Sequence, residues 1–198
     1  MIKRSSKILT LLYFLLSLGP VYGELYEFIL DNDEVFDKCP GMPDNNGIHD
    51  LFDMTNITMV YREGRVYISG NSACKWEGVE PTDRITSRGE LLKFQQGDWQ
   101  PTPISASTDD FCAIQFVPTS LTYPVWGRHI NPEDRKCVNN FGQIYHYRPF
   151  AFNTKYMFSH NMEGRHKIVV TTAAYDTSNR KRPKERCVQI FGEFVKVN

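Results

Sequence analysis

Residues 57–70 read ITMVYREGRVYISG, and they carry the clearest structural signal in the chain. The first six residues alternate between two faces with a period of two, as the side chains of a β-strand do. Glu63 and Gly64 interrupt this run, and a second period-two run begins at Arg65 and reaches Gly70. Two such runs around a turn that contains glycine predict a β-hairpin.

Further strands are predicted on both sides of this hairpin by short apolar runs that end in turn residues. They cover residues 25–30, 84–94, 143–158, 166–175 and 186–197. Pro149 interrupts one of these runs, which predicts two strands or a kinked one. Pro101 and Pro103 restrict strand pairing and predict an edge or an irregular crossing.

The remaining segments predict a helix and a loop. Thr108 is expected to cap a short helix that begins near Phe111, with acidic residues in the first turn. Residues 118–134 predict a long loop, and long loops in compact domains are often functional. The pattern as a whole predicts an all-β fold, an antiparallel sandwich or cup with one short helix. Residues 24–198 are expected to form a single domain.

The first 23 residues predict a secretory signal peptide. Lys3, Arg4 and Lys7 precede an apolar run over residues 8–18, and small residues end the segment at Gly23. The apolar run is too short to span a bilayer. A buried N-terminal helix is the alternative. Export would place the protein outside the cell, where its cysteines meet oxidising conditions.

Five cysteines follow the predicted cleavage site: Cys39, Cys74, Cys112, Cys137 and Cys187. Two disulfides and one remaining thiol are the simplest arrangement, although spacing alone does not fix the pairing. A bridge between the first and last of them would close most of the domain. No CxxC pair accompanies them, and no histidine is spaced to complete a zinc site, so we expect no structural metal. Asn56-Ile57-Thr58 is a sequon that predicts a surface glycan on Asn56.

Charge and motifs exclude several classes of function. The chain has 23 Lys and Arg residues and 23 Asp and Glu residues. It therefore lacks the excess of basic residues that is typical of a protein that binds nucleic acid. The basic run over residues 180–186 predicts a solvated loop or, alternatively, a patch for anionic head groups at a membrane surface. No nucleophile elbow, HExxH, P-loop or dinucleotide fingerprint occurs. The histidines are scattered, so we expect neither catalysis nor a cofactor.

Aromatic residues supply the positive signal, with 13 Phe, 10 Tyr and 3 Trp in the chain. Many of them will fill the core of a β-fold. The region from residue 123 to residue 158 also combines aromatic residues with prolines and loop signals. Apolar walls with few polar groups suit a lipid or another apolar ligand. The candidate pocket residues are Tyr123, Trp126, Phe150, Phe152, Tyr156 and Phe158.

Several short motifs occur in an order that resembles the insect chemosensory protein B family. They are Tyr26-Glu27-Phe28, Ile68-Ser69-Gly70-Asn71, Trp76, Pro81-Thr82-Asp83-Arg84, Gly97-Asp98-Trp99, Asp110-Phe111-Cys112, Gly164-Arg165-His166-Lys167 and Gly192-Glu193-Phe194. The family is similar to the ganglioside-activator branch of lipid-recognition domains. The resemblance covers nearly all of residues 25–197.

The resemblance implies an antiparallel β-cup around an apolar pocket, and extracellular binding of lipids or hydrophobic semiochemicals without catalysis. It also implies disulfides between Cys39 and Cys187 and between Cys112 and Cys137. The additional disulfides of the ganglioside-activator branch have no counterparts here. Cys74 matches no position of the family and is expected to be free or intermolecular.

Two functions therefore compete. The first is a secreted carrier or presenter of an apolar ligand that acts in chemosensation, in the perception of a pheromone or contact cue. The second is an interaction module without a small-molecule ligand, which binds a membrane receptor or channel ectodomain through exposed loops such as residues 123–129.

Overall fold

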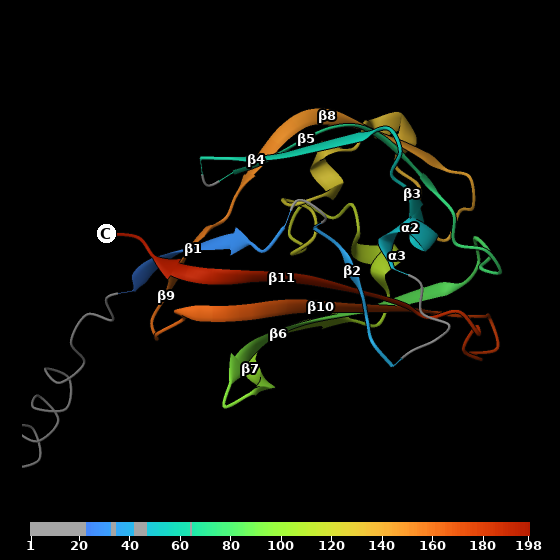
Figure 1. The fold of residues 1–198 in the computed structure, drawn as a ribbon. Coiled ribbons are helices and arrows are strands. Elements are labelled where there is room, and N and C mark those ends of the chain that lie inside the picture. The colour runs from blue at the N-terminus through green and yellow to red at the C-terminus, as the bar shows by residue number, and fades with distance from the viewer. Residues whose placement is uncertain (1–22, 33–34, 42–46, 64) are drawn as a thin grey trace, which may run out of the picture.

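The computed structural model describes residues 23–198 except residues 33–34, 42–46 and 64. Within these residues the chain forms two antiparallel sheets, and the smaller one lies above the larger one in Figure 1. The strands are β1 (Glu24–Leu30), β2 (Asp37–Lys38), β3 (Phe52–Asp53), β4 (Ile57–Arg62), β5 (Arg65–Cys74), β6 (Arg84–Gln95), β7 (Asp98–Thr108), β8 (Ile144–Asn153), β9 (Lys155–Phe158), β10 (Gly164–Tyr175) and β11 (Arg186–Lys196). The prediction of an all-β antiparallel fold is confirmed. The predicted signal peptide, apart from Gly23, lies outside the described residues.

The predicted hairpin belongs to the smaller sheet, in which β5 is the central strand. β4 pairs with β5 from Ile57 opposite Gly70 to Arg62 opposite Arg65. β3 continues along the same edge of β5, and β8 pairs with the other edge. The pairing of β5 and β8 shifts by one residue beside Pro149, which has no N–H to donate to the ladder. Pro149 therefore causes an irregularity inside β8, and the strand itself ends four residues later.

The larger sheet has the strand order β7-β6-β10-β11-β1-β9, and β2 pairs with a separate part of β11. The proline-containing strand β7 lies at an edge, as predicted, with a register shift between Glu90 and Leu92 of its neighbour β6. The chain passes from the smaller sheet to the larger sheet at Thr154, between β8 and β9. Near this crossing the Tyr61 hydroxyl of β4 donates to Glu27 of β1 at 2.6 Å.

The helices are short. α3 (Phe111–Ile114) confirms the predicted helix, but its cap is Asp110, whose carboxylate accepts the Ala113 N–H at 3.0 Å. Thr108 instead ends β7, and its hydroxyl accepts the Asp110 N–H. The sequence did not predict α2 (Ile48–Leu51), and the predicted loop over residues 118–134 contains two 3₁₀ turns, η1 (Gly127–His129) and η2 (Pro132–Asp134). In the described part of the chain no helix is long and apolar enough to cross a membrane.

Candidate functional site

Two separate clusters of buried side chains support the fold. The junction core draws residues from both sheets: Leu51, Phe52, Cys74, Trp76, Val79, Ile85, Ile130, Val138, Tyr145 and Ala174. The distal core contains Tyr26, Phe28, Leu91, Met162 and Phe194, and its strand residues all belong to the larger sheet. The rings of Phe28 and Phe194 lie 4.9 Å apart at their centroids. Among the described residues, the two sheets therefore share the junction core, whereas the distal core draws its strand residues from the larger sheet.

The inner face of the larger sheet is less buried between these two cores. β10 is a central strand, with β6 on one side and β11 on the other. Its inner-face side chains begin with buried His166 and end with buried Ala174. Between them Ile168, Val170 and Thr172 are only partly buried. A closely packed sandwich buries such central positions against the facing sheet. The middle of this face is therefore incompletely covered.

Gly89 gives independent evidence for open space above this face. It lies in β6 directly opposite Val170, so a side chain at this position would share the same face. Among the atoms that the structure describes, a Cβ placed on Gly89 would meet no heavy atom within 4 Å outside its immediate chain neighbours. The space in front of Gly89 is therefore wide enough for additional atoms.

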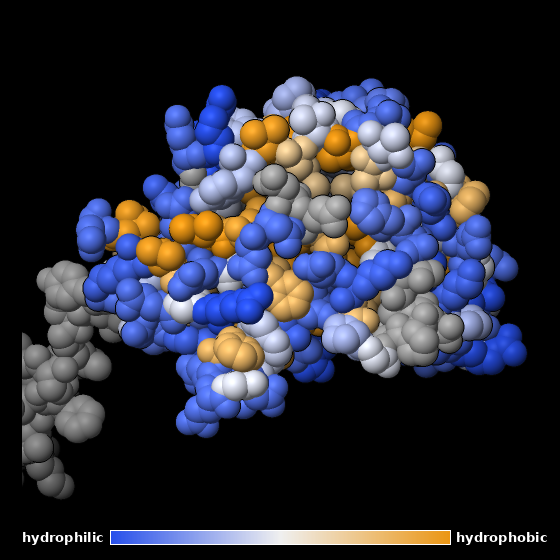
Figure 2. Space-filling view, in the orientation of Figure 1, coloured by the Kyte–Doolittle hydropathy of each residue, from blue (hydrophilic) through white to orange (hydrophobic). Residues whose placement is uncertain are grey.

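The smaller sheet presents a matching apolar surface. Ile57, Met59 and Ile68 share the face of β5 that carries buried Cys74, and each is partly buried. Phe150 lies opposite Ile68 and is also partly buried. We infer from strand parity that these four residues face Gly89, Ile168, Val170 and Thr172 of the larger sheet, and we call the space between them the interlayer groove. Figure 2 shows hydrophobic residues at several places on this face, some of them between the levels of the two sheets, among polar residues.

An aromatic cluster borders the junction-core end of the groove. The Trp126 ring centroid lies 6.1 Å from Phe52, 6.1 Å from Phe111 and 5.7 Å from Tyr145. The Trp126 indole N–H donates to the Tyr147 hydroxyl at 3.1 Å, and Ser72 Oγ lies 2.9 Å from the same oxygen. Burial raises the pKa of Tyr147, so its hydroxyl stays neutral. The polar atoms of this wall are satisfied internally, which leaves an apolar surface.

The six predicted pocket residues fall into two groups. Trp126 packs on the junction core. The Tyr123 ring centroid lies 5.9 Å from Cζ of Arg135. The rings of Phe150 and His129 are stacked, and their centroids lie 3.7 Å apart. Tyr156 and Phe158 lie on β9 beside the distal core, where Tyr156 is 45% exposed. Phe152 pairs with Val66 in β8, but its side chain lies outside the described part of the structure. Of these residues, Phe150 lines the groove and Trp126 borders it.

Three buried polar side chains carry nitrogen or oxygen atoms without a hydrogen-bond partner in the described part of the chain. They are Gln115, with both amide atoms, His166, with Nε2, and Arg186, with Nε and Nη1. Gln115 and His166 are fully buried, and Arg186 is 3% exposed. His166 has one partner, because its Nδ1 lies 2.8 Å from the Gly164 carbonyl oxygen. Unsatisfied buried groups of this kind are rare and call for a physical explanation.

The covalent frame has the two disulfides that the resemblance implies, Cys39–Cys187 and Cys112–Cys137. The first joins β11 to the segment after β2, and the second joins α3 to the segment before β8. Cys74 is a buried free thiol that donates to the Val138 carbonyl oxygen at 2.9 Å. This burial argues against an intermolecular bridge at Cys74. Disulfides of this kind are typical of an oxidising compartment.

Potential catalytic groups are dispersed. His146 Nδ1 lies 2.9 Å from Asp134 Oδ2, but the histidine side chain is 54% exposed. His129 is stacked on Phe150, and burial lowers its pKa. Within the described ranges no group of three or more metal-ligating side chains is close enough to hold a metal ion.

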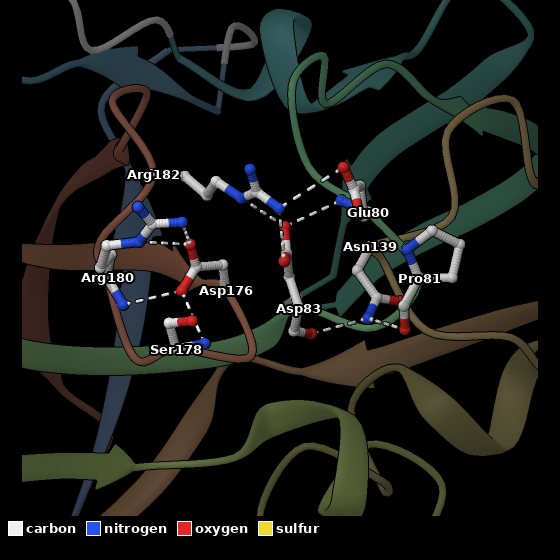
Figure 3. Close-up of polar contacts among 8 residues, drawn as sticks. All are labelled: Glu80, Pro81, Asp83, Asn139, Asp176, Ser178, Arg180 and Arg182. Carbon is white, nitrogen blue, oxygen red and sulfur yellow. Dashed lines mark hydrogen bonds and ion pairs between the residues drawn. The ribbon is translucent and has the colours of Figure 1, made fainter.

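The basic run over residues 180–186 is only partly a solvated loop. Figure 3 shows Arg182 directed at Asp83, with Nε–Oδ2 and Nη2–Oδ1 distances of 2.9 Å. Arg180 pairs with Asp176 at 2.9 Å. Arg186 is buried, so the prediction that this residue is solvated is wrong. The ion pairs hold the turn that leads into β11 against the start of β6.

Sequence reasoning missed the groove residues outside the aromatic region. Gly89 carried a usable signal, because an isolated glycine inside a strand often marks a close approach or a space. Arg186 carried another, because it shares the strand parity of Val188 and Ile190, which face inward.

No protein-family model matches this chain, and a comparison with curated proteins also gives no match.

Proposed function

We propose that the protein is a secreted, non-enzymatic binder of a lipid or hydrophobic semiochemical that acts in chemosensation. The observation that carries this proposal is the interlayer groove, where apolar side chains of both sheets keep accessible surface between two buried cores. The resemblance to chemosensory proteins supplies the biological setting. A groove between sheets suits an extended apolar molecule better than a compact polar one.

Apolar burial provides the driving force for such binding. Each methylene group transferred from water into the groove contributes about 0.8 kcal/mol. Burial of a ten-carbon segment would thus give about 8 kcal/mol. Association costs of at least about 4 kcal/mol offset part of this gain, which leaves weak to moderate affinity from the tail alone. A polar contact at one end of the ligand would add affinity and selectivity.

Secretion is supported by the two disulfides and by the charged and apolar pattern of residues 1–23. Asn56, the proposed glycan site, is exposed in the turn before β4. Thr58 of the sequon is exposed as well. A glycan on Asn56 would extend from the rim of the smaller sheet. Glycosidase treatment of the secreted protein should lower its mass, and an unchanged mass would contradict this part of the proposal.

Native mass spectrometry of the secreted protein, with organic extraction in parallel, tests the proposed function. A co-purifying apolar molecule, or uptake of one from a lipid mixture, is expected. Gly89→Leu should fill the groove and weaken uptake, because its side chain enters the space in front of β6. Arg88→Leu is the matched control, because Arg88 points to the opposite face and is exposed. A protein that stays empty and shows no change in Trp fluorescence would refute the proposal.

A second candidate function is favoured by the exposed apolar residues of the loop before η1. Leu121 is 76% exposed and Val125 is 53% exposed. Such side chains suit contact with a receptor or channel ectodomain. Leu121→Ser with Val125→Ser should then abolish cross-linking to a membrane protein and leave ligand uptake unchanged. Unchanged cross-linking in this variant would exclude the loop as the interface.

A further inference from the structure

We propose that Arg186 binds the carboxylate of an acidic amphiphile, such as a long-chain fatty acid, whose tail occupies the interlayer groove. This inference rests on the proposed function and specifies the ligand class of the same site. Two arginines of one segment, Arg182 and Arg186, differ in their hydrogen bonds. Arg182 makes two hydrogen bonds to Asp83, whereas Nε and Nη1 of Arg186 are buried and have no hydrogen-bond partner among the described residues.

The surroundings of Arg186 do not neutralise it by direct contact. In the part of the chain that the structure describes, no carboxylate lies within 4 Å of its guanidinium. The guanidinium lies over the Trp76 ring, with Cζ 5.8 Å from the ring centroid. Burial lowers the pKa of Arg186, and the more distant charges of Asp50 and Glu77 oppose this effect. An arginine remains charged under these conditions and therefore favours a bound anion.

The position of Arg186 fits one end of an amphiphile. Arg186 pairs with Thr172 across β11 and β10, and Thr172 pairs with Ser87 of β6. This polar row crosses the inner face of the larger sheet. The next inner-face row contains Val188, Val170 and Gly89.

The row after that contains Ile190, Ile168 and Leu91, which reach the distal core. Along these three rows the inner face thus changes from cationic and hydroxyl-bearing to apolar, before His166 and Lys93 occupy the following row. A ligand with an anionic head and an aliphatic tail matches this order. The Nε–H and the Nη1–H of Arg186 point to different sides of the guanidinium, so each can donate one charge-assisted hydrogen bond to a carboxylate oxygen, and a parallel pair of bonds would join either of them with Nη2.

The test compares oleate with oleyl alcohol, which has the same tail without the charge. Dissociation constants at neutral pH are measured by Trp fluorescence and by displacement of a fluorescent lipid. The wild-type protein should bind oleate at least about 10-fold more tightly, as expected for charged hydrogen bonds. Arg186→Met should lose this preference and still bind the alcohol. Lys184→Met removes an equal charge from an exposed side chain and should keep the preference.

Thermal unfolding of the ligand-free variants separates a binding role from a structural one. Arg186→Met removes a buried charge that has no ion-pair partner among the described residues, and it should raise the melting temperature. Arg186→Lys keeps a charge and should retain part of the preference for oleate. A lower melting temperature for Arg186→Met would reveal a partner within the chain and overturn the inference.

Equal affinity of the wild-type protein for the acid and the alcohol would overturn the assignment of Arg186 and leave the proposed function intact. If Arg186→Met still preferred oleate over oleyl alcohol, the assignment of Arg186 would likewise be overturned and the proposed function would stand. Absence of binding for both molecules would refute the proposed function and this inference together.

Discussion

Replacement of Asp83 by alanine should be among the most destabilising single changes in the chain. The Asp83 carboxylate is fully buried and accepts two hydrogen bonds from Arg182 at 2.9 Å. It also accepts the Glu80 backbone N–H at 2.8 Å. Removal of one partner of a buried pair costs about 3–5 kcal/mol, because the remaining charge loses its compensation. The Arg182 side chain retains 26% exposure and can recover water, so we expect about 3 kcal/mol.

A double-mutant cycle in chemical denaturation isolates the pair. The single variants are Asp83→Ala and Arg182→Met, and the cycle is completed by the double variant. Glu80→Gln is the control, because Glu80 lies 3.6 Å from the same guanidinium with a side chain that is 67% exposed. Its loss should cost less than about 1 kcal/mol. A coupling energy near zero between Asp83 and Arg182, or equal costs for Asp83→Ala and Glu80→Gln, would refute this reasoning.

Three further predictions concern the rest of the frame. Gly192→Ala should destabilise the fold by about 1–3 kcal/mol in thermal unfolding, because its Cβ would lie 2.6 Å from Phe28 Cζ; an unchanged melting temperature would contradict this. Burial lowers the pKa of His166 from 6.5, so the imidazole binds a proton more tightly in the unfolded chain than in the folded chain. Stability should therefore fall below about pH 6.5, by up to about 1.4 kcal/mol per unit, and His166→Gln should flatten that slope in denaturant titrations. Loss of the Cys112–Cys137 disulfide, with a sequence separation of 25, should cost about 3.5 kcal/mol on the loop-entropy scale, and a value near zero would show strain or residual denatured structure.

The sequence predicted strands well where period-two patterns were long. The hairpin of β4 and β5 occurs close to where alternation placed it, and the long strands β10 and β11 occur close to where apolar runs placed them. Local competition between capping groups was harder to resolve. Thr108 and Asp110 both suit an N-cap, and the choice between them depends on where β7 stops pairing with β6.

The candidate site was predicted less completely than the fold. Aromatic density pointed to residues 123–158, of which Phe150 lines the groove. The other wall consists of Gly89, Ile168 and Val170, which any buried strand could contain. These three residues line the groove because they are only partly covered by the rest of the protein. The extent of this cover depends on how far apart the two sheets lie. Sequence alone does not specify that separation, because side chains from distant segments determine it.

Cys74 gives the molecule an internal reporter of its own opening. Burial raises the pKa of this thiol, and its side chain is 1% exposed inside the core that both sheets share. A thiol in this state does not react with alkylating reagents until the surrounding core separates. The rate of Cys74 alkylation in the oxidised protein therefore measures how often the sheets part at their junction. A ligand that bridges the sheets should slow this reaction, and its effect can be followed without any introduced label.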